Sequence, residues 1–168
     1  MTREIWTIGH STRGIGDFVG LLEAWSIDLV ADVRRFPGSK RYPQFNRDAL
    51  AAELTRAQIN YRHFGSLGGR RHERKLNSPN TGWRVEAFNA YADFMSTGEF
   101  QDGLITLIAA AGTMRTAVMC SEAVPWRCHR RLIADALTVA GWTVWDILGA
   151  KQAEPHRLTE FARISERG

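Results

Sequence analysis

Short apolar segments of strand type alternate with helix-type segments along the chain. The strand-type segments are rich in β-branched and aromatic residues, which predicts strands at residues 4–8, 28–33, 60–64, 115–119 and 143–147. The helix-type segments repeat apolar side chains every three or four positions, which predicts helices at residues 15–25, 47–58, 83–96, 100–111 and 125–140. Because strands separated by helices form parallel β-α-β units, this alternation restricts the chain to the α/β class.

The alternation continues without a break that would separate two domains. The sequence contains no internal repeat, no low-complexity tract and no linker rich in Pro, Gly or Ser. A chain of 168 residues is long enough to bury one sizeable core. We therefore predict a single three-layer domain over residues 1–168, in which helices flank a mainly parallel, Rossmann-like sheet on both faces.

The composition is that of an ordinary globular protein, with 44% apolar and 24% charged residues. The longest apolar run, residues 104–111, is shorter than the ~18 residues that a membrane helix requires. The first residues resemble a strand rather than a signal peptide, and two cysteines make a poor disulfide framework. We expect a cytoplasmic protein that does not associate with a membrane.

Positive charge is concentrated in the middle of the chain. From Arg34 to Lys75 there are eleven Lys or Arg residues and three acids, although the net charge of the whole chain is only +4. Such a local excess suits an anionic partner such as phosphate or nucleic acid, although charged helix faces in contact with solvent produce the same pattern. Within this segment a loop rich in Gly and Arg brings Arg70 and Arg71 near Trp83, a combination that binds phosphates and stacks bases.

Polar residues follow three of the predicted strands at the point where the apolar pattern stops. These residues are His10 and Ser11, Asp32 and Arg34, and Cys120 and Glu122. The carboxyl ends of parallel strands meet at one edge of a sheet, so we expect these side chains to converge on a shared cleft. Each residue alone is more often structural, and the functional prediction depends on the combination.

The segment MCSEAVPWRCHRR, residues 119–131, contains both cysteines and allows two cysteine-based interpretations. A thiolate at Cys120, between a strand and a helix, would act as a nucleophile, with Arg127 binding an oxyanion. This loop, however, is poor in the glycines that let backbone amides converge on phosphate. Alternatively, Cys120, Cys128, His129 and His10 would supply nitrogen and sulfur ligands to a metal, although the adjacent Cys128 and His129 would rarely reach one ion.

A third interpretation, which we favour, assigns the chemistry to acids and bases and treats the cysteines as packing residues. Glu122, with His10 and Asp32, would then act as general acid or base in a hydrolase that cleaves a phosphate or glycosidic bond. We expect a nucleotide or nucleic-acid substrate, no resident cofactor, and phosphate binding by Ser11, Arg34, Arg70, Arg71, Arg127, His129 and Arg130. The alternative is a non-catalytic nucleotide- or nucleic-acid-binding module, which would gain nothing from a carboxylate in its pocket.

Four blocks of the sequence resemble one family of bacterial and archaeal proteins. They are TIGHS at 7–11, DVRRFPGS at 32–39, LGG at 67–69 and MCSEAVPWRCHR at 119–130. In this order they resemble domain of unknown function 488, whose pattern C-x-E followed by C-H-R falls on Cys120, Glu122, Cys128, His129 and Arg130. The resemblance implies a compact α/β domain and brings no established reaction, so the function has to be argued from the residues.

Overall fold

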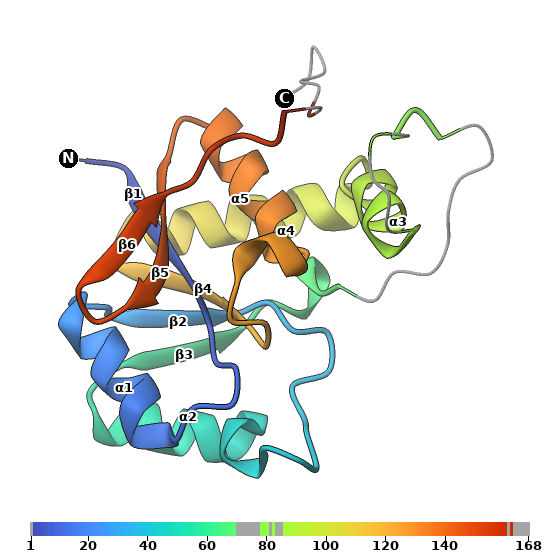
Figure 1. Ribbon diagram of the computed structural model, residues 1–168. Helices are drawn as coiled ribbons and strands as arrows, with labels where there is room; N and C mark the ends of the chain where they lie inside the picture. Colours follow the sequence, from blue (N-terminus) through green and yellow to red (C-terminus); the bar gives the residue numbers. More distant parts are fainter. Residues whose placement is uncertain (1, 70–77, 81, 83–85, 161, 163–168) are drawn as a thin grey trace.

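A six-stranded sheet forms the centre of the protein (Figure 1). The structure is a computed structural model that describes residues 2–69, 78–80, 82, 86–160 and 162. The strand order is β3-β2-β4-β1-β5-β6, in which the first five strands run parallel and β6 runs antiparallel to β5. The strands are β1 (Glu4–Gly9), β2 (Leu29–Asp32), β3 (Asn60–His63), β4 (Thr116–Cys120), β5 (Thr143–Gly149) and β6 (Gln152–Pro155).

Helices cover both faces of this sheet. They are α1 (Ile15–Ala24), α2 (Arg47–Arg56), α3 (Glu86–Phe94), α4 (Gly98–Ala111) and α5 (Arg130–Val139). Helices α1 and α2 lie on one face, and α3, α4 and α5 lie on the other (Figure 1). The α/β class, the mainly parallel sheet and the three-layer arrangement are therefore confirmed.

Two hydrophobic cores, one on each face of the sheet, follow from the alternation of side chains along the strands. In β1, Ile5 packs into the core beneath α4 and α5, whereas the next residue, Trp6, packs into the core beneath α1 and α2. Side chains of successive strand residues point to opposite faces of the sheet. A central strand that is covered on both sides must therefore carry apolar side chains on both faces. This requirement explains why the interiors of β1, β2 and β4 are largely apolar, whereas the buried Thr7 of β1 is hydrogen-bonded to Asp146.

The crossover connections that leave the parallel neighbours β1 and β4 run in opposite directions across the sheet, and Gly9 lies opposite Cys120 where these two strands end. From β1 the chain passes through α1 toward β2, on one side, whereas from β4 it passes through α5 toward β5, on the other. In open α/β sheets such a switch point leaves a crevice beyond the carboxyl ends of the two strands.

Some predicted boundaries are wrong. The helix predicted at 125–140 begins only at Arg130, because residues Pro125–Arg127 form a separate 3-10 turn. Strand β6 was not predicted, because its sequence QAEP has no apolar alternation. Within the described residues, no helix is long and apolar enough to span a membrane.

Candidate functional site

A cleft of about 510 Å³ opens at the carboxyl ends of β1, β2 and β4, where the switch point lies. Its lining residues come from the turns after these strands and from the segments packed above them. They are His10, Ser11, Thr12, Arg34, Arg35, Phe36, Gly38, Ser39, Tyr42, Gly69, Ala87, Phe88, Tyr91, Cys120, Ser121, Glu122, Arg127, Cys128 and His129. Of the six strand-end residues chosen from the sequence, all except Asp32 line this cleft.

The turn after β1 packs directly against the turn after β4. The amide of His10 donates a hydrogen bond to the carbonyl oxygen of Cys120 at 3.0 Å. Gly9 permits this approach, because a Cβ atom at this position would lie 1.6 Å from the carbonyl oxygen of Glu122. Ser11 has a φ of 51°, in the left-handed region that non-glycine residues rarely adopt. The two strand ends therefore form one tightly packed wall of the cleft.

A buried ion pair lies behind the cleft. Arg34 donates from Nε to Oδ1 of Asp32 at 2.9 Å and from Nη2 to Oδ2 at 2.7 Å, the bidentate geometry that holds a guanidinium in one orientation. The hydroxyl group of Tyr61 also donates to Oδ2 of Asp32. Both carboxylate oxygens of this fully buried residue are thus engaged, which leaves Asp32 to orient Arg34.

His10 is held beside this ion pair. Its ring stacks on Phe45 with centroids 4.2 Å apart, and its Nδ1 lies 2.9 Å from the carbonyl oxygen of Ser11. That contact assigns the ring proton to Nδ1, so Nε2 is an acceptor 3.4 Å from Nη1 of Arg34. Burial, assisted by the nearby Arg34, lowers the pKa of His10 to about 4. The ring is therefore neutral at neutral pH and contributes no charge to the cleft.

The two cysteines contact each other in the lining of the cleft. The thiol of Cys128 donates to the sulfur of Cys120 across 2.6 Å, and Nη1 of Arg130 lies 3.2 Å from the same sulfur. Burial alone would raise the pKa of Cys120, but the hydrogen bond from Cys128 and the Arg130 cation together lower it below its usual value. Burial and the contact with Cys120 raise the pKa of Cys128 well above its usual value. The pair therefore favours one thiolate and one thiol.

His129 is fixed next to this pair. Its Nε2 lies 3.0 Å from the carbonyl oxygen of Val33, and its Nδ1 lies 3.5 Å from the sulfur of Cys128. The ring centroid lies 5.1 Å from that of Tyr91, and a Cβ atom on Gly69 would lie 2.7 Å from Nδ1. Only glycine fits at position 69, so the ring of His129 is packed between Tyr91 and the backbone of Gly69.

The predicted anion-binding residues occupy different environments. Arg127 is exposed at the cleft, as is Glu122. Arg130, by contrast, is 1% exposed, and its donors are directed at the sulfur of Cys120 and the carbonyl oxygens of Glu122 and Ala123. Arg70 and Arg71 lie outside the described residues.

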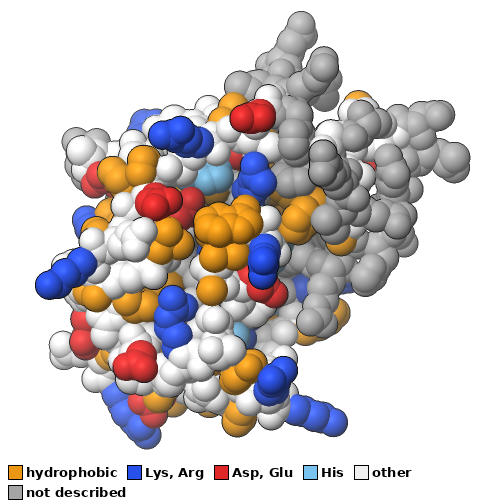
Figure 2. Space-filling view, in the orientation of Figure 1, with side chains coloured by type: hydrophobic (Ala, Val, Ile, Leu, Met, Phe, Trp, Pro, Cys, Tyr) orange, Lys and Arg blue, Asp and Glu red, His pale blue; other side chains and the backbone are white. Residues whose placement is uncertain are grey.

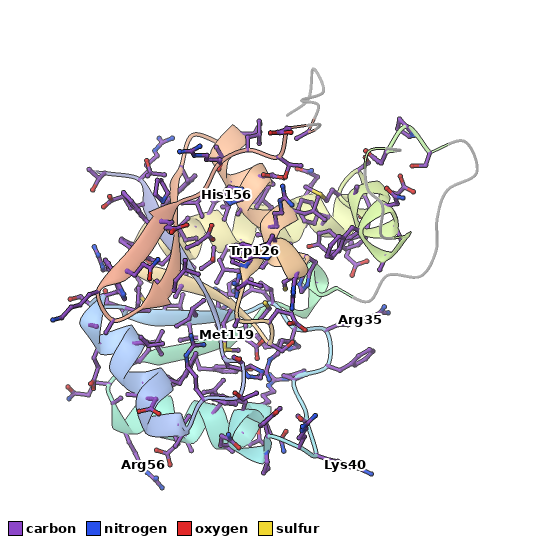
Figure 3. All side chains as sticks on the ribbon, in the orientation of Figure 1. Arg35, Lys40, Arg56, Met119, Trp126 and His156 are labelled. Carbon is purple, nitrogen blue, oxygen red and sulfur yellow. The ribbon has the colours of Figure 1, made fainter. Side chains whose placement is uncertain are left out.

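Sequence reasoning missed Arg35 and Phe36 as cleft residues. Phe36 is 64% exposed, and the guanidinium carbon of Arg35 lies 5.3 Å from the centre of its ring. Arg35 extends outward from the loop that follows β2 (Figure 3). Their position in DVRRF could have indicated both residues, because they directly follow Arg34, which was predicted for its place after a strand end.

Charged side chains of both signs are interspersed on the face shown in Figure 2, rather than gathered in one basic band. Part of the basic segment of the sequence forms α2, where Arg56 pairs with Glu53 at 2.5 Å on the surface. Within the part of the chain that the structure describes, no group of three or more His, Cys, Asp or Glu side chains is placed to hold a metal ion.

Comparison with protein-family models finds one family, the domain of unknown function DUF488, which matches residues 14–137. This match covers more than half of the chain. The chain is a member of the DUF488 family. No curated protein and no solved structure matched it. In this DUF488 chain the matched region contains β2, β4, both cysteines and the turn between them, whereas His10 and Ser11 precede it.

Proposed function

We propose that the cleft is the active site of an enzyme that cleaves a phosphate or glycosidic bond in a nucleotide or at an accessible nucleotide of a nucleic acid. The observation that supports this most is the position of Glu122, the one acid among the described residues that line the cleft. It lies among cationic and aromatic side chains, the combination that nucleotides need for their phosphates and bases. The volume of about 510 Å³ is in the usual range for small-molecule sites.

Arg35, Phe36 and Arg127 suit the binding of such a substrate. The exposed ring of Phe36, with the guanidinium of Arg35 near it, offers a planar surface on which a base can stack. Arg127 is exposed on the segment that leads into α5, from which its cation can contact a phosphate.

Glu122 would transfer the proton in the reaction. A general base needs an accessible carboxylate within hydrogen-bonding reach of a water molecule or leaving group, and Glu122 is the exposed carboxylate among the described lining residues. Asp32 is fully buried and paired with Arg34, so its role is to keep the cleft wall rigid. The ring of His10 is oriented by the carbonyl oxygen of Ser11, so its Nε2 is left to accept a hydrogen bond. Because the ring is neutral, it carries no positive charge that would attract a second carboxylate.

The test is a screen of nucleotides and short single-stranded oligonucleotides, with separate detection of released phosphate and released base. Glu122→Gln should lower turnover at least ~100-fold and leave binding, measured by thermal shift, nearly unchanged. The matched control is Glu23→Gln, which changes an exposed acid on α1 that does not line the cleft. Arg127→Ala should weaken binding and reduce its dependence on salt.

Two results would contradict the proposal. Turnover that Glu122→Gln leaves intact would exclude the carboxylate as the working group. Nucleotide binding by the wild-type protein without release of phosphate or base would favour the non-catalytic binding module instead.

A further inference from the structure

The proposed bond cleavage leaves the two cysteines without a role. Both line the cleft although they are almost completely buried, with exposed fractions of 1% for Cys120 and 6% for Cys128. Their sulfur atoms are 2.6 Å apart, and a movement of about 0.5 Å would bring them to disulfide bonding distance. Two thiols so placed at a ligand cleft are a candidate for redox chemistry.

Arg130 supplies an independent argument, because it is a buried cation without a carboxylate partner among the described residues. Its Nη1 contacts the sulfur of Cys120 and the carbonyl oxygen of Glu122, and its Nε has no hydrogen-bond partner in this part of the chain. A buried charge without a counter-charge is strongly destabilising. A thiolate at Cys120 provides that counter-charge, so the packing of Arg130 itself favours an ionised Cys120.

His129 is positioned to take the proton of the second thiol. Because its Nε2–H donates to the carbonyl oxygen of Val33, Nδ1 carries the lone pair. This lone pair lies 3.5 Å from the sulfur of Cys128. Cys128 thus has two acceptors for its proton, the Cys120 sulfur and His129.

The same contacts argue against phosphate chemistry at Cys120. In loops that bind phosphate, backbone amides converge on the anion. Here the carbonyl oxygens of Glu122 and Ala123 are directed at the guanidinium of Arg130, beside the Cys120 sulfur. The surroundings of the sulfur therefore suit a small neutral oxidant better than a phosphate dianion.

We propose that Cys120 and Cys128 form a redox-active dithiol that reduces a small hydroperoxide, with Cys120 as the nucleophile and Cys128 as the resolving thiol. The near-complete burial of both residues restricts the oxidant to hydrogen peroxide or a short alkyl hydroperoxide. This activity is separate from bond cleavage at Glu122 and requires no nucleotide.

The reaction has two steps. In the first, the Cys120 thiolate attacks the outer oxygen of the hydroperoxide, a sulfur–oxygen bond forms and the oxygen–oxygen bond breaks. Cys120 becomes a sulfenic acid, and the displaced hydroxide or alkoxide takes a proton from solvent and leaves as water or an alcohol. In the second, Cys128 passes its proton to His129 and attacks the sulfenic sulfur of Cys120. The disulfide forms, and the displaced hydroxide leaves as water with that proton. An external dithiol reductant returns the disulfide to two thiols.

The experiment adds one equivalent of hydrogen peroxide to the fully reduced protein, removes the excess oxidant, and then blocks the remaining thiols with iodoacetamide in denaturant, where both cysteines are accessible. Mass spectrometry should show a monomer lighter by two hydrogen atoms with Cys120 linked to Cys128, formed at least about tenfold faster than free cysteine oxidises. Dithiothreitol should reverse the change. Thiols that remain open to alkylation, or disulfides that link different molecules, would overturn the proposal.

Variants separate the two roles. Cys128→Ser should stop the reaction at a sulfenic acid on Cys120, detected by mass spectrometry as the gain of one oxygen atom, whereas Cys120→Ser should oxidise no faster than free cysteine. Arg130→Gln should move the midpoint of the pH–rate profile upward, and the control Arg56→Lys on exposed α2 should not. If Arg130→Gln fails to fold, the wild-type protein still decides: the rate of its oxidation by hydrogen peroxide must rise with pH with a midpoint below the ~8.5 of a free thiol. A midpoint at or above that value would refute the thiolate.

Discussion

Gly9 is the residue at which the turn after β1 packs against the turn after β4 in the wall of the cleft. We expect Gly9→Ala to lower the free energy of unfolding by about 3 kcal/mol or more, because the added methyl group would collide with the backbone at Glu122 and separate the two strand ends. Urea denaturation measures this change. Gly16→Ala is the matched control: it lies in α1 with no atom within 4 Å of the new methyl group and should stabilise the protein by roughly 0.5–1 kcal/mol. Similar effects at both positions would contradict the explanation.

At the scale of single residues, sequence reasoning succeeded where a strand end fixes the position. His10, Arg34 and Cys120 could be assigned to one cleft because parallel strands end at one edge. The contact between Cys120 and Cys128 was not predictable, because it depends on how the intervening turn folds back. The orientation of Arg130 was equally inaccessible, since its charge suggested an anion and the structure directs its donors at a sulfur and two carbonyl oxygens.

At the scale of elements, the start of α5 shows why the sequence predicts that a helix exists better than it predicts where the helix begins. Pro125 favours a helix start, and the 3-10 turn Pro125–Arg127 does begin there. Cys128 then adopts extended backbone angles of −134° and 148°, which interrupt the helix before Arg130. Apolar periodicity gives no sign of such an interruption. The extended backbone at Cys128 places its sulfur near the amide of Arg130, which donates a hydrogen bond to that sulfur.

Strand β6 was missed for a different reason. It is an edge strand held by pairing with β5, with Pro155 opposite Trp145, and its residues are mostly exposed. An edge strand with solvent on most sides carries little apolar pattern, and a proline is tolerated there. Its presence depends on the neighbouring β5 rather than on its own composition.

The segment after β6 is anchored by His156, which connects α5 and β5 through two buried acids. Its Nε2 lies 2.8 Å from Asp135, and its Nδ1 lies 3.3 Å from Asp146. His156→Gln should destabilise the protein by about 3 kcal/mol, because it removes the cation between two buried carboxylates. Thermal unfolding should show a Tm lower by roughly 6–12 °C for a chain of this size.

Glu154→Gln is the control for His156. Glu154 is exposed on β6 and its side chain accepts a hydrogen bond from Gln152 at 3.3 Å, so its replacement should change stability by less than about 0.5 kcal/mol. Equal destabilisation by both variants would mean that β6 itself, and not the buried acids, holds the segment.

At the scale of the whole molecule, two histidines with opposite pKa shifts limit the pH range of high stability. Burial lowers the pKa of His10 to about 4, whereas hydrogen bonds to Asp135 and Asp146 overcome the effect of burial and raise the pKa of His156 to about 9. The unfolded value of both is about 6.5. Unfolding therefore takes up a proton at His10 on the acid side and releases one at His156 on the alkaline side.

The expected stability profile has a maximum close to pH 6.5 and falls on both sides. Below this value His10 binds a proton more readily in the unfolded chain, so its contribution is lost as the pH falls from about 6.5 toward 4. The contribution of His156 is fully present below about 6.5 and is lost as the pH rises through about 9. Urea denaturation at pH 4.5, 6.5 and 9 should show this shape, with His10→Gln flattening the acid side and His156→Gln flattening the alkaline side. If each variant instead kept the wild-type slopes, other groups would have to carry the pH dependence, and the two histidines would be excluded as its source.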